Sequence, residues 1–558
     1  MKQSTKYLAL VYAMFVVIKI MLSFSTPTLS IYNDEYLYLK LAQSIAEGSY
    51  NIHGTPSNEY PPLYSLVIAP AQLITRTSWA FIITKIINTL VSTAVIFPAF
   101  FLLKKFLTER QSLIGTSIAM LHPSVFAFSP YLMSENLFYT LVLCAILIMI
   151  NAIKTQKIHL HISTGMVLGA VFLTRALGLL LVPVYIIAQG VYMIKREKKL
   201  RKTKVINLVM ALCVAGIFII SWMLYNITFA SDNPLGVYTK EATIPSREVL
   251  PQMALWIILY SAVLTISTAI IFPAAALRFM KNEKSEEGRI LAIIMGAMLI
   301  IFLLAGANHS IHSNIKTPLT WILGRPIGRY IDALGVPLIL TGFIGIIKNG
   351  KKMTTPMLVC SSVALLSLPV LMYFNLGPVN NLSLAAFEGL KRVIDGIAGQ
   401  APSTLAMSIA AMILIGWATI LLATQKRKIM LMITLIFFII TNIAALAGTY
   451  YNAATWNDHQ QIKLSRWVNE NISQEKTIAI DKEECAEGDV KHNTKNLCHL
   501  EGHTAAIGTW IRNPIIITEK PESGDYVISA HRRDFQQIRE ESGIFVYKVE
   551  KQEIAKGI

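Results

Sequence analysis

The chain has 558 residues, of which 54% are apolar and only 15% are charged. Globular chains carry about 25% charged residues. This composition excludes a disordered chain, a collagen and a disulfide scaffold, and it argues against a soluble enzyme. The net charge is +17, but the basic residues sit in short runs between long apolar blocks. That arrangement indicates a polytopic membrane protein and argues against a nucleic-acid partner.

The apolar blocks predict an all-α membrane domain of about thirteen transmembrane helices, since roughly 17–25 residues are needed to cross a bilayer. The predicted spans are 7–24, 79–103, 112–128, 136–153, 160–174, 177–194, 205–224, 254–277, 290–307, 331–347, 355–374, 403–424 and 429–449. We expect the first apolar stretch to be a retained span, because it is too long for a cleaved signal peptide.

The basic residues predict the orientation of these spans. With the N-terminus in the cytoplasm, every second connection is cytoplasmic, and these connections hold 24 basic and 5 acidic residues. An odd number of spans then places residues 450–558, with 14 basic and 17 acidic residues, outside. The pattern predicts a multi-pass plasma-membrane protein with its C-terminal region on the extracytoplasmic side.

Two domains are expected: a transmembrane domain over 1–449 and a small extracytoplasmic α/β domain over 450–558. The first outer loop, 25–78, contains an amphipathic stretch over 36–46 and an apolar stretch over 63–74 that is too short to span. Both are typical of interfacial helices. The tail is expected to form a helix over 458–472 and strands over 477–481, 514–518, 525–529 and 544–549.

Two of the five cysteines, Cys485 and Cys498, fall in the outer tail, where a disulfide would persist. His492, His499 and His503 are close in sequence, so a zinc site is an alternative, although their spacing matches no standard signature. Two free thiols are a third possibility.

The strongest local signal is the acidic pair Asp34-Glu35, which follows the first span. A carboxylate held partly desolvated at a membrane surface can act as a general base. The structural alternative is a helix start, with Asp34 as the N-cap and Glu35 favoured by the helix dipole.

Further polar residues fall at the predicted outer ends of the spans. Arginine binds phosphate through a planar fork at low desolvation cost, which makes Arg329 the preferred phosphate ligand. The alternative for each cation is an interfacial anchor, and for Glu135 a first-turn acid. Candidates for substrate binding are Arg329, Arg325, Arg175, Glu135, Lys85 and Tyr60, and His53, His309 and His312 are candidates for acceptor binding or for purely structural roles.

In order and on one predicted side, the chain carries Asn33-Asp34-Glu35-Tyr36, Tyr60-Pro61-Pro62, Ser134-Glu135, Thr174-Arg175 and Gly328-Arg329-Tyr330. This arrangement resembles the GT-C glycosyltransferases, polytopic enzymes that take sugars from polyprenyl-phosphate carriers. Within that class the chain looks like the protein O-mannosyltransferase and lipid A aminoarabinose transferase branch. The resemblance covers nearly the whole chain.

The resemblance implies that Asp34 is the catalytic base and that Glu35 binds acceptor or metal. It also implies a polyprenyl-phosphate sugar donor and a glycan, lipid or protein acceptor. The aminoarabinose branch has an Arg shortly after its acidic pair and a Lys before its Pro-Pro. This chain has Leu37-Tyr38 and Tyr60 there, which puts an aminoarabinose substrate in doubt and removes two expected phosphate contacts.

The chemistry implied needs one carboxylate. A polyprenyl phosphate leaves as a phosphate monoester without a strong general acid, so a single base with nearby Arg or Lys suffices, and the anomeric carbon should invert. The sequence contains no Asp-X-Asp motif, which disfavours a metal-bound nucleotide sugar. No metal ligands are assigned, and a divalent cofactor is left open.

A secondary transporter and a non-catalytic assembly or sensor protein are the alternatives. Transporters usually carry ionisable residues near the bilayer midplane and broken helix pairs, whereas the charges here cluster near the predicted outer ends. Substituting Asp34 by Asn should abolish sugar transfer but matter little to a scaffold.

Overall fold

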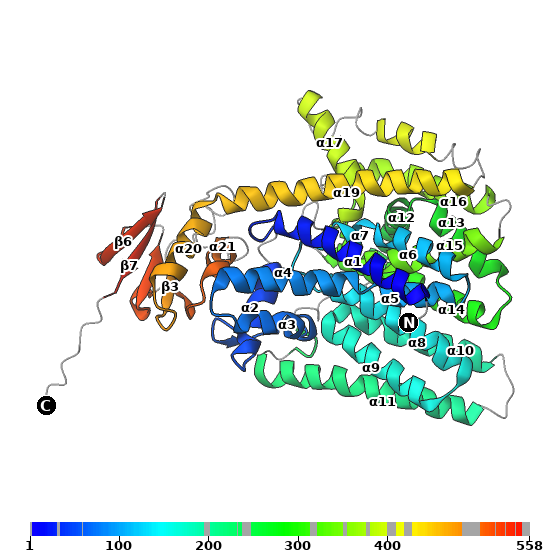
Figure 1. The fold of residues 1–558 in the computed structure, drawn as a ribbon, viewed down its shortest axis with the longest axis horizontal. Coiled ribbons are helices and arrows are strands. Elements are labelled where there is room, and N and C mark those ends of the chain that lie inside the picture. The colour runs from blue at the N-terminus through cyan, green and yellow to red at the C-terminus, as the bar shows by residue number, and fades with distance from the viewer. Residues whose placement is uncertain are drawn as a thin grey trace. The chain divides into compact units, whose positions relative to one another are not determined.

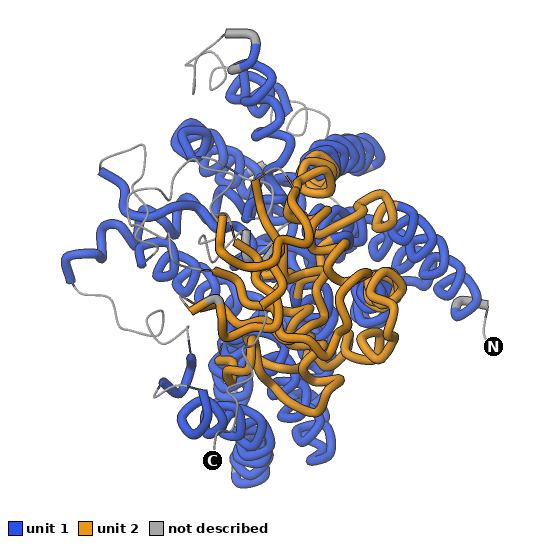
Figure 2. The backbone as a smooth tube through the Cα atoms, turned by 90° about the vertical axis from the view of Figure 1, so that its left-hand side faces the viewer, with its two compact units in different colours: residues 1–21, 88–130, 134–448 blue, residues 22–87, 131–133, 449–558 orange. Residues whose placement is uncertain are grey.

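The computed structural model describes residues 3–30, 34–58, 60–194, 201–230, 233–236, 247–312, 321–349, 354–374, 376, 380–398, 409–417, 427–481, 503–518, 520–529, 532–541 and 543–549. Its contacts divide the chain into two compact units (Figure 2). Unit 1 comprises residues 1–21, 88–130 and 134–448, and unit 2 comprises 22–87, 131–133 and 449–558. The expected helical membrane architecture with a small C-terminal sheet is confirmed.

Unit 1 is built from helices (Figure 1). Helices α1, α4 and α19 contribute residues to both units. The helices are α1 (Gln3–Phe24), α4 (Thr77–Thr93), α5 (Ile96–Lys104), α6 (Glu109–Met120), α7 (Pro123–Phe126), α8 (Glu135–Thr155), α9 (Ile158–Thr174), η2 (Ala176–Leu180), α10 (Leu181–Ile194), α11 (Arg201–Tyr225), α12 (Leu250–Ser267), α13 (Ile271–Asn282), α14 (Glu286–His312), η7 (Gly328–Tyr330), η8 (Asp332–Leu334), α15 (Gly335–Asn349), α16 (Thr354–Tyr373), η9 (Leu382–Leu384), α17 (Ala385–Ala398) and α19 (Arg427–Asn457).

Nine helices in the described part of the chain are long and apolar enough to cross a membrane, and each overlaps a predicted span. They are Thr5–Phe24, Thr77–Lys104, Glu135–Thr155, Ala176–Ile194, Lys202–Ala230, Arg247–Ser267, Glu286–His312, Thr355–Tyr373 and Lys428–Asn457. The predicted fifth span is the shorter apolar helix Ile158–Thr174. The total of thirteen stays a prediction, and part of the span 403–424 lies outside the described residues.

The predicted span 254–277 differs from the structure, because it is broken into α12 and α13. The break falls at Ala269 and Ile270, which have φ values of 64° and 56°. Pro273 explains it: proline has no N–H to bond the carbonyl four residues earlier, and its ring clashes with that carbonyl, which belongs to Ala269. The helix is therefore interrupted at this point and restarts as α13.

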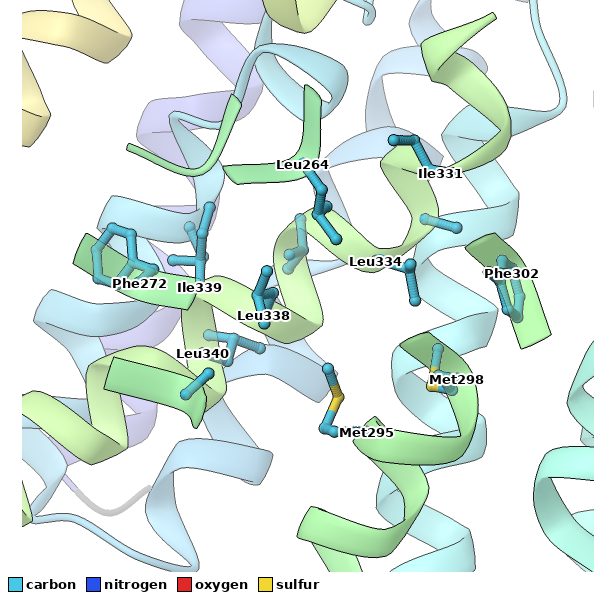
Figure 3. Close-up of a cluster of buried hydrophobic side chains, with 14 of the residues drawn as sticks. Leu264, Phe272, Met295, Met298, Phe302, Ile331, Leu334, Leu338, Ile339 and Leu340 are labelled. Carbon is cyan, nitrogen blue, oxygen red and sulfur yellow. The ribbon is translucent and has the colours of Figure 1, made fainter. Parts of the chain in front are cut away.

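The core of unit 1 lies where α12, α13, α14 and α15 meet. Buried side chains of these helices, among them Leu264, Phe272, Phe302 and Leu338, belong to one apolar cluster (Figure 3). Helix α15 approaches α13 closely: a Cβ at Gly342 would collide with the carbonyl oxygen of Phe272. Small residues allow this approach between membrane helices, where dispersion contacts replace the hydrophobic effect as the driving force.

Unit 2 combines elements from distant parts of the sequence. Helix α21 packs against α2, where a Cβ on Gly508 would lie 2.6 Å from the Tyr36 hydroxyl oxygen. The elements are α2 (Asp34–Ala46), β1 (Asn51–Ile52), β2 (Thr55–Pro56), α3 (Leu63–Ile68), η1 (Ala69–Leu73), α20 (Gln460–Asn471), β3 (Ile478–Asp481), α21 (His503–Trp510), β4 (Ile515–Thr518), η11 (Pro521–Ser523), β5 (Tyr526–Ser529), β6 (Gln536–Glu541) and β7 (Ile544–Lys548).

The described residues of the tail form a five-stranded sheet in the order β4-β3-β5-β7-β6. Strand β3 is parallel to β4 and β5, whereas β7 is antiparallel to β5 and β6. All four predicted strands are confirmed. Strand β6 was missed because it is an edge strand of mostly exposed polar residues, which lacks the apolar signal of a buried strand. The division into domains 1–449 and 450–558 stays a prediction.

We predict that Gly342→Ala destabilises unit 1 by about 1–3 kcal/mol, because the added methyl meets a backbone carbonyl that cannot rotate away. Gly296→Ala on α14 is the matched control, since nothing lies within 4 Å of its added Cβ. Thermal unfolding of both variants in detergent measures the difference. Equal unfolding temperatures would contradict the close packing of α13 and α15.

Candidate active site

The two residues of the acidic pair have different surroundings at the start of α2. Glu35 is 1% exposed. Its Oε2 accepts a hydrogen bond from the Ser30 N–H at 3.0 Å, and its Oε1 accepts one from the Leu132 N–H at 2.8 Å. Asp34 is half-buried, and its Oδ1 accepts a hydrogen bond from the Tyr60 hydroxyl at 2.8 Å. Glu35 therefore links the segment before α2, at Ser30, to the segment at Leu132. Asp34 is the more accessible of the two carboxylates.

An aromatic cluster holds the Tyr60 hydroxyl in place. The Tyr60 ring stacks on Tyr38, with centroids 4.6 Å apart, and Tyr64 meets Tyr38 edge-on at 5.0 Å. Tyr38 and Tyr64 are fully buried. The stacking restricts the Tyr60 side chain and so orients the hydroxyl toward Asp34.

Lys85 is buried and surrounded by oxygen acceptors. Its Nζ donates to the carbonyl of Ser23 at 2.8 Å, to the hydroxyl of Thr26 at 2.6 Å and to the carbonyl of Thr26. The ammonium also lies 4.7 Å from the centroid of the Phe81 ring. Because Ser23 is in the last turn of α1, Lys85 satisfies a carbonyl at the helix end that has no partner within the helix.

In unit 1, Glu135 and Arg175 form a buried ion pair. Arg175 follows the last residue of α9 in an extended conformation, and its guanidinium lies 5.4 Å from the centroid of Tyr330. The Tyr330 ring in turn stacks on His309 with centroids 3.9 Å apart. The ends of α8, α9, α14 and η7 thus share one polar cluster in which the buried charges compensate one another.

The loop that carries Arg329 is anchored by its backbone. The Gly328 N–H donates to Asn381 Oδ1 at 2.9 Å, and the Arg329 N–H donates to the Asn380 carbonyl at 3.0 Å. The Arg329 side chain is half-buried, and Arg325 is exposed.

Sequence reasoning missed Asp332, Ser383 and Tyr139. Asp332 is buried and accepts a hydrogen bond from Ser383 Oγ at 2.7 Å. Tyr139 is within electrostatic reach of Asp332, Glu135, Arg175 and Arg329. Asp332 carried a usable signal, because it is a carboxylate at the very start of the predicted span 331–347, and ionisable residues in membrane spans are rare and usually functional.

Known proteins share this architecture. Residues 59–222 match the family model described as dolichyl-phosphate-mannose-protein mannosyltransferase. The solved structure of ArnT from Cupriavidus metallidurans bound to undecaprenyl phosphate is similar over 98% of both chains, with 12% identity and a TM-score of 0.57. The chain has the GT-C fold. The family match and the shared fold agree with the resemblance to the O-mannosyltransferase and aminoarabinose transferase branch.

Other solved GT-C structures are similar as well. ArnT in the apo state matches with 12% identity and a TM-score of 0.52, over 97% of this chain and 98% of that one. An oligosaccharyltransferase from Archaeoglobus fulgidus tethered with an acceptor peptide matches at 11% identity over 92% of this chain and 64% of its own, with a TM-score of only 0.45. The matched family and these neighbours are glycosyltransferases. No curated protein has a significantly similar sequence.

The predicted site residues divide between the two units. Unit 2 holds Asp34, Glu35, Tyr60 and Lys85, and unit 1 holds Glu135, Arg175, Arg325 and Arg329. Cys485 and Cys498, with His492 and His499, lie outside the described residues. Within the described ranges, no group of three His, Cys, Asp or Glu residues could hold a metal ion.

We predict that Glu35→Gln lowers the unfolding temperature, whereas Asp34→Asn does not. The amide introduced by Glu35→Gln keeps one acceptor oxygen but turns its NH₂ toward a buried backbone N–H, at a cost of about 1–3 kcal/mol. After Asp34→Asn, the side-chain carbonyl can still accept from the Tyr60 hydroxyl. Thermal unfolding of both variants in lipid nanodiscs tests this, and an equal loss would contradict the assigned role of Glu35.

We also predict that Arg175→Met costs about 3–5 kcal/mol, because it leaves the Glu135 carboxylate buried without its ion-pair partner. The double variant Arg175→Met/Glu135→Gln should recover part of that loss, since no unpaired charge remains. Equilibrium unfolding in mixed micelles compares them. A double variant as unstable as the sum of both single variants would show that the pair is uncoupled.

Proposed function

We propose that this protein is a membrane glycosyltransferase that transfers a sugar from a polyprenyl-phosphate donor to an acceptor on the extracytoplasmic side, with Asp34 as the general base. The observation that carries the assignment is the contrast within the acidic pair. Glu35 is committed to two backbone N–H groups, and Asp34 is more accessible and is oriented by Tyr60. The family match, which includes Tyr60, and the similarity to an ArnT structure bound to undecaprenyl phosphate support it.

In the proposed reaction, the Asp34 carboxylate takes the proton from an acceptor hydroxyl. The acceptor oxygen bonds to the anomeric carbon of the sugar as the bond from that carbon to the phosphate oxygen breaks. Polyprenyl phosphate leaves with the bonding electrons, and the configuration at the anomeric carbon inverts. The positive end of the α2 dipole favours the ionised Asp34 carboxylate, which is the form that accepts the proton.

The leaving phosphate needs cationic partners. We assign this role first to Arg329, whose backbone is anchored through Asn380 and whose planar fork suits a phosphate, with Arg325 beside it in the sequence. Arg175 is paired with Glu135, and its contact with Tyr330 fits a positioning residue better. Lys85 already donates hydrogen bonds to three oxygen atoms of Ser23 and Thr26. This favours a structural role for Lys85 over binding of the phosphate.

The extracytoplasmic location is part of the proposal. It rests on the 24 basic against 5 acidic residues of the alternate connections, which favour a cytoplasmic N-terminus. The same count supports an outer position for residues 450–558. A donor panel that includes both hexoses and pentoses identifies the sugar class.

The test is release of polyprenyl phosphate by purified protein in nanodiscs, using a panel of polyprenyl-phosphate sugars and a crude acceptor extract. Loss of a general base costs about 10²–10⁴ in rate, so Asp34→Asn should lose activity to that extent with an unchanged unfolding temperature. Tyr60→Phe should lose less, because it keeps the carboxylate and removes only its orienting hydroxyl. Activity of Asp34→Asn within about a factor of two of the parent would sink the assignment.

A secondary transporter is the second candidate, because the break between α12 and α13 is of the kind that transporter helices show. A transporter would leave every sugar donor intact and would not depend on Asp34. Intact donors together with sugar uptake into proteoliposomes would favour it.

A further inference from the structure

Unit 2 contains a polar cavity of about 600 Å³ beside the second half of α2. Its walls come from α2, from the β1–β2 hairpin and from the segment between α21 and β4. The side chains that matter are Lys40, Gln43, His53, Arg512 and Asn513. Asp34 does not line this cavity, which is therefore separate from the proposed base.

Several polar atoms of this wall are buried without a hydrogen-bond partner in the described part of the chain: Gln43 Nε2, Arg512 Nε and Nη2, and Asn513 Oδ1. Asn513 is only 3% exposed. Its Nδ2 donates to the carbonyls of Ser473 at 2.7 Å and Lys476 at 2.9 Å, which establishes Oδ1 as the remaining acceptor. Buried polar atoms are nearly always hydrogen-bonded, so this wall has the donors and the acceptor of a ligand site.

The ionisable side chains that line the cavity are Lys40, Arg512, His53 and one carboxylate, Glu47, so basic residues outnumber acidic ones. Lys40 Nζ donates to the Ile511 carbonyl at 2.6 Å, and Arg512 donates from Nη1 to the Gln72 carbonyl at 3.3 Å. Burial, with the charge of Arg512, lowers the pKa of Lys40 to about 7, against the opposing effect of Glu47. Burial and the charge of Lys40 lower the pKa of His53 to about 4. The Lys40 ammonium is thus destabilised by burial and by the charge of Arg512, and an anion bound beside both side chains would stabilise the charged form of Lys40.

We propose that this cavity binds an oxyanion, a phosphate or a carboxylate, carried by a hydroxyl-rich ligand. The oxyanion accepts hydrogen bonds from Arg512 and Lys40. A neighbouring hydroxyl of the ligand donates to Asn513 Oδ1, and Gln43 Nε2 donates to another ligand oxygen. Arginine suits the oxyanion because its donors match the geometry of both groups.

We assign the ligand to the acidic end of the acceptor, an assignment that rests on the proposed function. Lys40 and Gln43 follow Asp34 by six and nine residues on the same helix. At about 1.5 Å per residue they lie roughly 9 and 14 Å along its axis. At about 100° per residue, Lys40 and Gln43 point roughly 240° and 180° around α2 from Asp34. An acceptor anchored in the cavity by its acidic group therefore has to pass around the first turns of α2 to bring a hydroxyl to Asp34.

The experiment measures binding to full-length protein in nanodiscs without any sugar donor, by calorimetry at constant ionic strength. The probes are glycerol 3-phosphate and gluconate, with glycerol and chloride as neutral and simple-anion controls. We expect saturable binding of at least one polyol anion and none of either control. The stronger probe identifies phosphate or carboxylate as the recognised group. Equal, non-saturable responses to all four would overturn the site.

Three variants test the residues. Arg512→Gln should weaken binding by about tenfold or more, because it removes the charged guanidinium fork. Gln43→Met should also weaken binding. It tests the site independently if Arg512→Gln does not fold. Arg539→Gln, which changes an exposed arginine on β6 that is paired with Glu541, should leave binding unchanged. If Arg512→Gln and Gln43→Met both bind like the parent, the proposal is wrong.

Asp34→Asn separates this inference from the proposed reaction. The variant should lose sugar transfer but bind the polyol anion as the parent does, because the cavity does not include Asp34. If Asp34→Asn loses transfer but the parent protein binds no polyol anion, the proposed transferase activity is supported. The proposed anion site in the cavity is then wrong. If the parent protein binds the polyol anion but releases polyprenyl phosphate from no sugar donor, the cavity still binds an anion. The assignment of that anion to the acceptor is then wrong.

Discussion

The buried carboxylate of Glu35 is the interaction on which the arrangement around Asp34 depends. It accepts hydrogen bonds from the backbone of Ser30 and of Leu132, residues that are far apart in the sequence. Consecutive residues of a helix point about 100° apart, so once Glu35 faces inward, Asp34 is directed away from the same interior. One residue of the pair holds the fold, and its neighbour meets Tyr60 in a less buried position.

The same compensation governs the polar groups of unit 1. A charge in an apolar bundle is costly unless it is paired, and Arg175 is paired with Glu135 while its guanidinium lies over Tyr330. Asp332 accepts a hydrogen bond from Ser383. These contacts hold the ends of α8, α9, η7 and η8 in register. Arg329 lies on a loop that is anchored through its backbone, which makes it the better candidate for a substrate phosphate.

Much of the fold was predictable because membrane spans are local in sequence. Among the residues that the structure describes, nine long apolar helices overlap predicted spans, and four short strands of the tail were placed by their β-branched residues. The break at Ala269 and Ile270 was missed, although Pro273 was a readable signal for it. Strand β6 was missed because its pairing with β7, rather than its own composition, makes it a strand.

What the sequence by itself determined was the membrane class, the expected orientation, the acidic pair and the likeness to GT-C enzymes, because block length, charge distribution and motif order are local properties. The tertiary structure alone decided which carboxylate is buried and that Tyr60 faces Asp34. It also showed that Lys85 binds carbonyls of residues 23 and 26, and that Lys40 and Arg512 share a cavity. Those outcomes depend on hydrogen bonds and packing between residues far apart in the chain, and no local pattern encodes them.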